Sequence, residues 1–180
     1  MTIPNVLLKQ HVRESNAIEG ITNENGPLFD QHLQVAQAVA KNPDYYVQNM
    51  CAIHWQLMSG TPYPEGQTCG VYRSCCVYVG NREMPGKDQV PRLMEHWYKL
   101  CAQVKVGDGK ACLCLHYLAL CIHPFADGNG RATRLHYNAL RLTAGLPWKI
   151  IFRNERSEYY AQIRSIEDNL FPAFVQQAFG

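Results

Sequence analysis

Residues 110–134 read KACLCLHYLALCIHPFADGNGRATR, and this stretch decides how the chain folds. After its first lysine, the part up to Ile122 is apolar apart from one histidine. A run of this length is shorter than the ~20 residues that cross a bilayer, so it predicts a helix buried in the middle of the protein. Pro124 disfavours helical backbone at the residue before it, so we expect the helix to end at Ile122 and to leave His123 at the edge of the core. A second helix is predicted at about Gly130–Ala144.

The loop at residues 127–130, DGNG, leads directly into that second helix. Its glycines allow positive φ and leave room for a ligand to reach backbone N–H groups, and the helix N-terminus favours an anion. Arg131 and Arg134 share one helix face, where guanidinium groups can bind phosphate oxygens in pairs. Asp127 is compatible with bound phosphates if a hard cation such as Mg²⁺ lies between them. Because His123 can accept a proton near neutral pH, the pattern predicts a nucleotide phosphate site with a base at its edge.

Taken singly, these features are common for structural reasons, because histidines often serve cores or hydrogen-bond networks and helix arginines are mostly solvated. The order of the twelve residues from His123 to Arg134 is specific, however. It resembles the signature of the Fic family, His-x-Phe-x-Asp/Glu-Gly-Asn-Gly-Arg-x-x-Arg, at every fixed position. Segments similar to other parts of that family extend the resemblance to about residues 10–170, and they are Gly70–Arg73, Ala144–Pro147 and Tyr159-Tyr160.

The resemblance implies a nucleotidyltransferase, a protein adenylyltransferase that moves AMP from ATP to a Ser, Thr or Tyr hydroxyl of a protein (AMPylation). By that resemblance His123 is the general base and Asp127 holds Mg²⁺ against the phosphates, while Phe125 anchors the loop in the core. The residues implied to bind the nucleotide are Gly128, Asn129, Gly130, Arg131, Arg134, Tyr159 and Tyr160. The two tyrosines would flank the adenine, although helix packing explains them equally well.

A second motif lies near the start of the chain, where residues 15–20 read SNAIEG. By itself this is the end of an amphipathic helix with a glycine stop. It also resembles the Ser/Thr-x-x-x-Glu-Gly inhibitory motif of some Fic proteins, which implies autoinhibition. By that resemblance Ser15 and Glu19 belong to an inhibitory helix at about residues 5–20, and Glu19 pairs with Arg134. An arginine that serves a carboxylate cannot also bind the γ-phosphate of ATP.

The remaining pattern predicts a mainly α, single Fic-type helical domain over residues 1–180, with a short β-hairpin flap at about 71–85 and a signature loop and helix at 123–144. Gly80-Asn81 is the predicted hairpin turn, and the hairpin would align a target segment by strand addition. Asn5 is the expected cap of the first helix, and Gly20 its stop. Apolar periodicity predicts the other helices at Asn5–Ile18, Phe29–Lys41, Pro43–Met58, Asp88–Val104, Lys110–Ile122, Asn154–Ile166 and after Pro172.

Length, charge and cysteine spacing exclude several classes of protein. The chain has 180 residues, which fits one domain, and its 17 basic against 15 acidic residues give no electrostatic case for nucleic-acid or membrane binding. The N-terminus lacks the pattern of a secretory signal, so we expect a cytoplasmic protein. The spacing of the eight cysteines fits neither a zinc site nor a disulfide framework, and we expect mostly buried, reduced thiols.

Several alternatives stay open at this level. Toxin-like relatives transfer phosphate instead of AMP, but they carry lysine at the position of Gly130. In some relatives the inhibitory glutamate supports removal of AMP from the target, and this de-AMPylating activity is a further alternative. A catalytically silent nucleotide-binding regulatory module would bind ATP without labelling any protein. A toxin paired with a separate antitoxin is less expected, because the inhibitory motif lies in this chain. The target protein is not disclosed, and self-modification and homo-oligomer formation are both compatible with the sequence.

Overall fold

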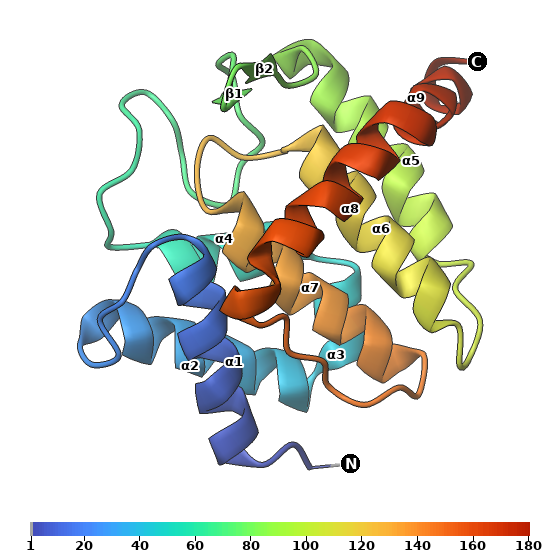
Figure 1. Ribbon diagram of the computed structural model, residues 1–180. Coiled ribbons are helices and arrows are strands. Elements are labelled where there is room, and N and C mark those ends of the chain that lie inside the picture. Colours follow the sequence, from blue (N-terminus) through green and yellow to red (C-terminus); the bar gives the residue numbers. More distant parts are fainter. Residues whose placement is uncertain (1) are drawn as a thin grey trace.

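The computed structural model describes residues 2–180 (Figure 1). Over this range the helices are α1 (Asn5–Ile18), α2 (Pro27–Lys41), α3 (Pro43–Val47), α4 (Met50–Met58), α5 (Val90–Cys101), α6 (Gly109–Ile122), α7 (Asn129–Thr143), α8 (Arg156–Asn169) and α9 (Phe171–Phe179). The strands are β1 (Tyr78–Val79) and β2 (Arg82–Glu83), and short 3₁₀ turns precede α5 and α8 at Lys87–Gln89 and Arg153–Glu155. The prediction of a mainly α fold with one hairpin is confirmed.

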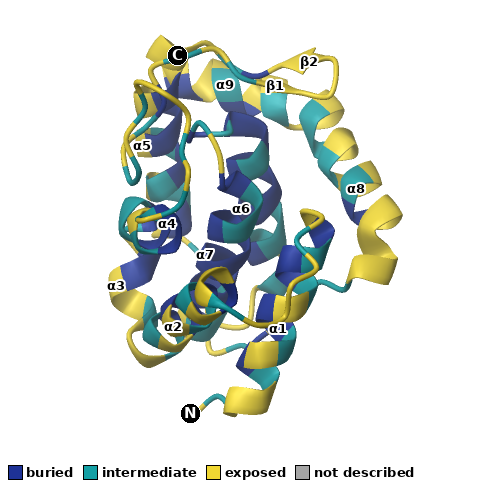
Figure 2. Ribbon diagram, turned by 90° about the vertical axis from the view of Figure 1, so that its left-hand side faces the viewer, coloured by how far each residue is buried: buried dark blue, intermediate teal, exposed yellow. Residues whose placement is uncertain are grey.

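The helices α6 and α7 form the centre of the molecule, as Figure 2 shows by their burial. The helices α5 and α8 pack on α6, while α2, α3 and α4 pack on α7. Apolar side chains such as Trp97, Ile122, Phe125 and Leu135 are fully buried between these helices. Burial of each such side chain contributes about 1.5–3 kcal/mol, so the segment that joins α6 to α7 is anchored on a well-packed core.

The loop between α6 and α7 begins where the sequence predicted. The helix α6 ends at Ile122, and His123 has left-handed backbone with φ of 51°. Because Pro124 follows, His123 is kept out of the right-handed helical region. Left-handed backbone costs a non-glycine residue roughly 1–2 kcal/mol, so the surrounding contacts must hold this conformation in place.

The helix α1 ends in a glycine motif as expected. Gly20 has φ of 80°, its N–H donates to Ala17 O at 3.1 Å, and the Ile21 N–H donates to Asn16 O at 3.0 Å, the two bonds of a Schellman cap. The expectation that Asn5 caps this helix is wrong. Asn5 is already inside the first turn, and its Oδ1 accepts a hydrogen bond from Gln37 on α2 at 3.0 Å.

The single helix predicted from Pro43 to Met58 is divided into α3 and α4. The break falls at Asn49, whose backbone leaves the helical region with φ of −141° and ψ of 61°. Its side-chain amide donates to Tyr45 O at 2.8 Å, and the following Met50 N–H donates to the Tyr98 hydroxyl at 2.9 Å. A partner on α5 thus replaces the helical bond, which the apolar period of this segment does not reveal.

The hairpin β1–β2 lies at one end of the molecule (Figure 1). Tyr78 pairs with Glu83 and Val79 with Arg82, around a turn in which Gly80 has φ of 61°. The predicted turn is therefore confirmed. The Arg82 guanidinium bonds Glu167 at 2.7 Å and Asp168 at 2.8 Å, and these two ion pairs join the hairpin to α8.

The structure bears on two features of the composition, the apolar runs and the cysteines. Within residues 2–180, no helix is both long enough and apolar enough to cross a membrane. The eight cysteines are free thiols, but only Cys101, Cys112 and Cys121 are buried, and Cys76 is exposed. The expectation that the thiols are mostly buried is therefore wrong.

Candidate active site

The loop between α6 and α7 is shaped by one glycine, not two. Gly128 has φ of 74°, and a Cβ there would lie 2.7 Å from Met58 Sδ. Gly130 was expected in the loop but lies in the first turn of α7 without positive φ. What Gly130 provides is space, because a Cβ at this position would collide with Glu19 Oε1. The missing side chain therefore lets the Glu19 carboxylate reach the start of α7.

The side chain of Asn129 is fully engaged inside the loop. Its Oδ1 accepts from the Phe125 N–H at 2.9 Å, and its Nδ2 donates to Phe125 O at 2.8 Å. The resemblance implied that Asn129 binds the nucleotide; in this structure its side-chain amide bonds the Phe125 backbone and holds the turn closed. The Phe125 ring is fully buried, as expected for an anchor.

A histidine that the sequence analysis overlooked supports the same loop. The His54 ring stacks on Phe125 with centroids 3.8 Å apart, its Nδ1 accepts from the Gly70 N–H at 2.8 Å, and its Nε2 donates to Asp127 O at 2.9 Å. These partners fix one neutral tautomer. Burial lowers the pKa of His54 to about 4, which keeps the ring neutral. A lone histidine in an apolar helix gave no signal of this role.

The start of α7 presents hydrogen-bond donors to the cavity. Across residues 2–180, no acceptor pairs with the backbone N–H groups of Asn129, Gly130 and Arg131, whereas the Gly128 N–H donates to Asp127 Oδ1 at 2.6 Å. The Arg131 guanidinium lines the same cavity, and its buried Nε has no partner in that range either. Free N–H groups at a helix N-terminus beside a cation form an anion site.

The second arginine of the motif is occupied. Arg134 is buried, its Nε donates to Ser15 Oγ at 2.8 Å, and its Nη2 donates to Ser15 O at 2.9 Å. The same Nη2 lies 2.7 Å from Glu19 Oε1. The structure therefore brings Ser15 and Glu19, near the start of the chain, together with Arg134 of the central helix α7, as the resemblance implied.

His123 lies at the cavity wall with its imidazole half-buried. Its pKa is lowered to about 4, mainly by burial and also by the Arg73 charge, while a hydrogen bond with the Leu120 backbone and the charges of Glu19 and Asp127 act in the opposite direction. The ring is therefore neutral near pH 7 and can accept a proton. A nearby triphosphate would raise its pKa, because negative charge favours the imidazolium.

Arg73, another residue whose role the sequence analysis did not identify, fixes the backbone of His123. Its guanidinium is buried without a carboxylate and donates to His123 O at 2.7 Å, to Cys75 O at 2.9 Å and to Pro85 O. Its own N–H donates to Pro124 O at 2.9 Å. Because Cys75 and Pro85 flank the hairpin, one side chain joins both ends of the hairpin to the loop. The sequence showed only that Arg73 precedes the hairpin.

Two adjoining hollows make up the site. The larger has a volume of about 400 Å³ and lies between residues 126–131 and the hairpin residues Val77 and Tyr78. The smaller, about 150 Å³, is mostly apolar and lies between α6, α8 and the hairpin. Glu19, His123 and Gly130 line both hollows, so the Glu19 carboxylate stands where they meet.

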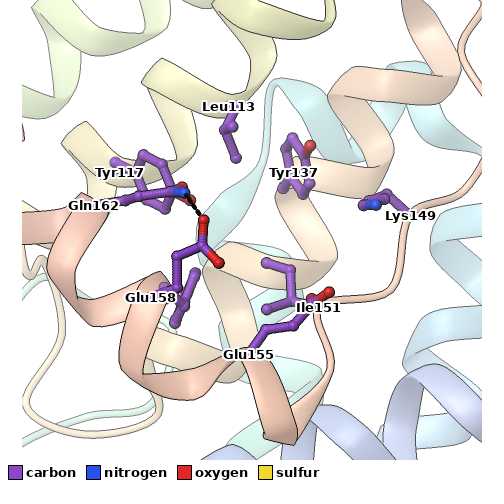
Figure 3. Close-up of a pocket in the computed structure, with 9 residues that line it drawn as sticks. Leu113, Tyr117, Tyr137, Lys149, Ile151, Glu155, Glu158 and Gln162 are labelled. Atoms are coloured by element: carbon purple, nitrogen blue, oxygen red, sulfur yellow. Dashed lines mark hydrogen bonds between the residues drawn. The ribbon is translucent and has the colours of Figure 1, made fainter.

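Tyr159 and Tyr160, which the resemblance implied to flank the adenine, both line the smaller hollow. Tyr159 is buried and its hydroxyl bonds His116 Nε2 at 2.8 Å, while the half-buried Tyr160 ring lies under Arg156 at 5.2 Å. Tyr159 also lines a separate cleft of about 220 Å³ between α6, α7 and α8, shown in Figure 3. That cleft contains neither His123 nor the loop, so it is not the candidate active site.

Asp127 carries an exposed carboxylate at the larger hollow. Its Oδ1 accepts from Gly128, which leaves Oδ2 for another partner. Among the described residues, no cluster of three or more His, Cys, Asp or Glu side chains could hold a metal by itself. One carboxylate beside an anion site is the donor set that suits Mg²⁺ shared with phosphate oxygens.

Comparisons with known proteins agree with this geometry. The chain is 29% identical over 195 aligned positions to "Protein adenylyltransferase Fic" of Aedes aegypti, an alignment that covers 93% of this chain and 38% of that protein. It is 32% identical over 133 positions to the protein of the same name of Drosophila mojavensis, covering 72% of this chain and 26% of that protein. The chain thus spans well under half of the curated relatives it matches.

Solved structures show the same fold. A Fic domain containing signaling protein from Bacteroides thetaiotaomicron superposes with a TM-score of 0.70 at 17% identity, covering 96% of this chain and 81% of that one. A Fic family protein from Desulfovibrio desulfuricans G20 gives a TM-score of 0.62 at 25% identity, covering 98% and 59%. A sequence model described as Fic/DOC family matches residues 44–140, more than half of the chain. The chain therefore belongs to the Fic/DOC family.

Proposed function

We propose that this chain is a protein adenylyltransferase that transfers AMP from ATP to a hydroxyl of a protein. The observation that supports this most is the placement of a neutral imidazole, His123, beside three backbone N–H groups and the Arg131 Nε that have no hydrogen-bond partner among residues 2–180. A base and an anion site in one cavity are what attack on a phosphate by a hydroxyl requires. The names of the curated relatives agree with this reaction.

In the proposed reaction the target hydroxyl lies against the His123 ring. His123 accepts the hydroxyl proton while the oxygen forms a bond to the α-phosphorus, and the bond to pyrophosphate breaks. The N–H groups of Asn129 and Gly130 stabilise charge on the phosphate oxygens, and Arg131 binds the β/γ end. Asn129 contributes through its side chain only indirectly, by keeping the loop closed.

Asp127 is the residue we propose to hold Mg²⁺ against the phosphates. The exposed carboxylate fits an ion that takes its other ligands from ATP and water. When bound, the ion would neutralise part of the phosphate charge. The chain itself supplies the position of the carboxylate, which His54 holds through the Asp127 carbonyl.

The smaller hollow is the proposed site of the adenine. Its lining is mostly apolar, with Val79 and Met84 of the hairpin facing Ile163 and Tyr160 of α8. A flat base can be buried there while the phosphates lie in the larger hollow. The exposed strand β1, with Tyr78 and Val79 at the surface, is the proposed place where a target segment adds as a strand.

The contact between Glu19 and Arg134 is the proposed autoinhibitory element. While Ser15 and Glu19 hold Arg134, the guanidinium cannot bind a γ-phosphate, and the carboxylate repels an anion in the space above Gly130. We accordingly assign residues 5–20 as the inhibitory helix, 71–85 as the flap and 123–144 as the signature loop and helix of a single domain.

The decisive test replaces Glu19 with glycine, the residue that frees Arg134 without adding a side chain. Wild-type and Glu19→Gly protein are incubated with Mg²⁺, a lysate of the source cell and ATP labelled on either the α- or the γ-phosphate. We expect label from the α-phosphate on protein, increased at least about 10-fold by the substitution, since a buried arginine regains its ligand.

Other outcomes separate the alternatives. Label from the γ-phosphate would indicate phosphate transfer, and ATP binding without any label would indicate a silent nucleotide-binding module. Glu19→Gln is the matched control, because it keeps the size of the side chain but removes its charge. Equal labelling by all three proteins would contradict the inhibitory role of Glu19.

A further inference from the structure

The helix that carries the inhibitory motif also carries a buried histidine without partners. His11 on α1 is 1% exposed, and within the described residues neither of its ring nitrogens has a hydrogen-bond partner. His32 on α2 is equally buried; its Nδ1 bonds Asn16 Oδ1 at 2.8 Å, but its Nε2 has no partner in that range. The two rings meet edge to face with centroids 6.1 Å apart. Buried polar atoms are normally paired, so two adjacent imidazoles that leave three buried ring nitrogens without partners within residues 2–180 require a physical explanation.

This histidine pair, His11 and His32, lies next to the inhibitory contact. His11 precedes Ser15 by one helical turn and Glu19 by two, so all three residues lie along one side of α1. Asn16, the partner of His32, is also on α1. Both rings are buried where α1 lies on α2 and α7, and the packing of these helices is visible in Figures 1 and 2.

The charges that act on the pair are positive. Arg134 on α7 lies close enough to disfavour protonation of both rings, and Arg131 acts on His32 as well. Trp148, from the segment after α7, packs against His11 with centroids 5.1 Å apart and brings no charge. The nearby carboxylates have other partners: Glu14 of α1 accepts the Arg153 N–H, and Glu19, which follows α1, binds Arg134. The remaining ionisable groups of α1 and α2 are exposed, and they are Lys9, Arg13, Asp30 and Lys41.

We propose that the histidine pair makes the docking of α1 sensitive to pH, so that mildly acidic solution releases α1 from α2 and α7. Release of α1 separates Ser15 and Glu19 from Arg134. The proposal that α1 undocks depends only on how α1 packs and does not require the proposed function. Its meaning as activation rests on the proposed function, in which Arg134 must be free to bind the nucleotide.

The direction in which pH changes the docking of α1 follows from proton linkage. In the docked state burial lowers the pKa of His11 to about 3, with Arg134 adding to the effect, and burial also lowers the pKa of His32 well below its usual value. In the undocked state both rings reach water and return to a pKa of about 6.5. The undocked state therefore binds more protons below about pH 6.5, and docking weakens as the pH falls through that value.

The size of the effect follows from the same values. Between pH 7.5 and 5.0, each histidine can weaken the docking equilibrium by up to about 30-fold. Two independent histidines can therefore weaken it by up to about 900-fold. Above about pH 7 both states carry neutral rings, so docking is at full strength there.

Other buried histidines do not produce this selective effect. Burial also lowers the pKa of His54 and His136 to about 4 and that of His116 to about 3. Their hydrogen bonds reach the loop, α3, α7 and α8 instead of α1. Protonation of these three residues would weaken the whole domain, which can be measured separately.

The test is hydrogen exchange with peptide resolution, read by mass spectrometry on the full chain at pH 7.5 and 5.0. After correction for the intrinsic pH dependence of exchange, we expect protection of residues 5–18 to fall by at least 100-fold in the wild type. Peptides from α5 and α6 give the stability of the whole domain. These peptides should exchange more slowly than the peptides of α1 at both pH values.

Substitutions at His11 and His32 test whether these two residues cause the pH dependence of α1 docking. His11→Leu removes the titratable group and its orphaned nitrogens, and His32→Gln keeps a donor for Asn16. Each single variant should retain about a 30-fold dependence or less, and the double variant should show none. His136→Gln is the matched control, a buried histidine away from α1, and it should keep the wild-type response. Protection of α1 that does not change with pH in the wild type, or that changes equally in the double variant, would overturn the proposal.

A separate activity measurement keeps this proposal distinct from the proposed function. Wild-type labelling with α-labelled ATP should rise from pH 7.5 to 5.5, relative to Glu19→Gly protein measured at the same pH. If Glu19→Gly protein labels nothing at any pH, the adenylyltransferase assignment fails, while the exchange measurement still decides whether α1 undocks.

Discussion

The loop at residues 123–130 and the hairpin β1–β2 face each other across one cavity, yet they are held in different ways. Asn129, His54 and the Phe125 ring hold the loop through buried packing and hydrogen bonds. The hairpin consists of two-residue strands that are exposed on both sides, and its far end is tied to α8 by surface ion pairs of Arg82. Buried, satisfied polar networks are rigid, whereas exposed pairs contribute little.

This difference fits the division of labour in the proposed reaction. The groups that contact the phosphates need fixed positions, because small misplacements reduce the rate strongly. A segment that accepts varied protein targets gains from adjustable geometry, and elements of low local stability provide it. The buried Arg73 side chain connects the two regions, since it donates to the loop at His123 and to both ends of the hairpin.

The largest expected effect comes from removing the imidazole of the rigid region. His123→Ala, made in Glu19→Gly protein, should lower AMP transfer by about 10²–10⁴-fold, because the hydroxyl loses its general base. ATP binding, measured by calorimetry, should change little, since the donors of α7 remain. His123→Asn is the control for backbone strain, because asparagine tolerates the left-handed conformation at φ of 51°. Retained transfer in both variants would show that His123 is not the base.

The second largest effect is expected from removing the side chain that connects the two regions. Arg73→Met should lower the free energy of unfolding by about 3 kcal/mol, because His123 O, Cys75 O and Pro85 O lose a charged donor together. Urea denaturation measures this change. Hydrogen exchange should also increase in the hairpin more than in α6. Arg73→Lys keeps the charge and some of the bonds, so an equal loss in both variants would mean that the forked geometry is what matters.

The sequence predicted the features of these regions that depend on residues adjacent in the chain. The helix end before Pro124, the hairpin turn and the glycine after α1 were predictable, because proline and glycine act on the backbone of their own neighbours. The position of Arg134 beside Glu19 followed from motif resemblance and not from spacing. Local signals of this kind need no knowledge of distant partners.

The rest depends on contacts between segments that are far apart in the sequence. The break between α3 and α4 requires the Tyr98 hydroxyl from α5, and the support by His54 requires Gly70 and Asp127. The motif resemblance implied that Asn129 binds the nucleotide, but it did not show that the nearby Phe125 backbone takes both hydrogen bonds of the side-chain amide. Side chains of these types have several partners available, and only the packed structure selects one.

The smallest effect is expected in the exposed region. Arg82→Ala removes both ion pairs of β2 with α8, but the guanidinium is solvated, so the midpoint of thermal unfolding should not change measurably. The hairpin nevertheless loses its tie to the α8 residue Glu167, which also lines the smaller hollow together with Val79. KM for a protein target should therefore rise a few-fold while kcat stays close to its value in Glu19→Gly protein, because the loop is untouched. Lys99→Ala, which removes an exposed ion pair with Glu95 on α5, controls for a general loss of surface charge. A fall in kcat as large as the rise in KM would show that the hairpin and the loop move as one unit, and would contradict the division between a rigid catalytic side and an adjustable target side.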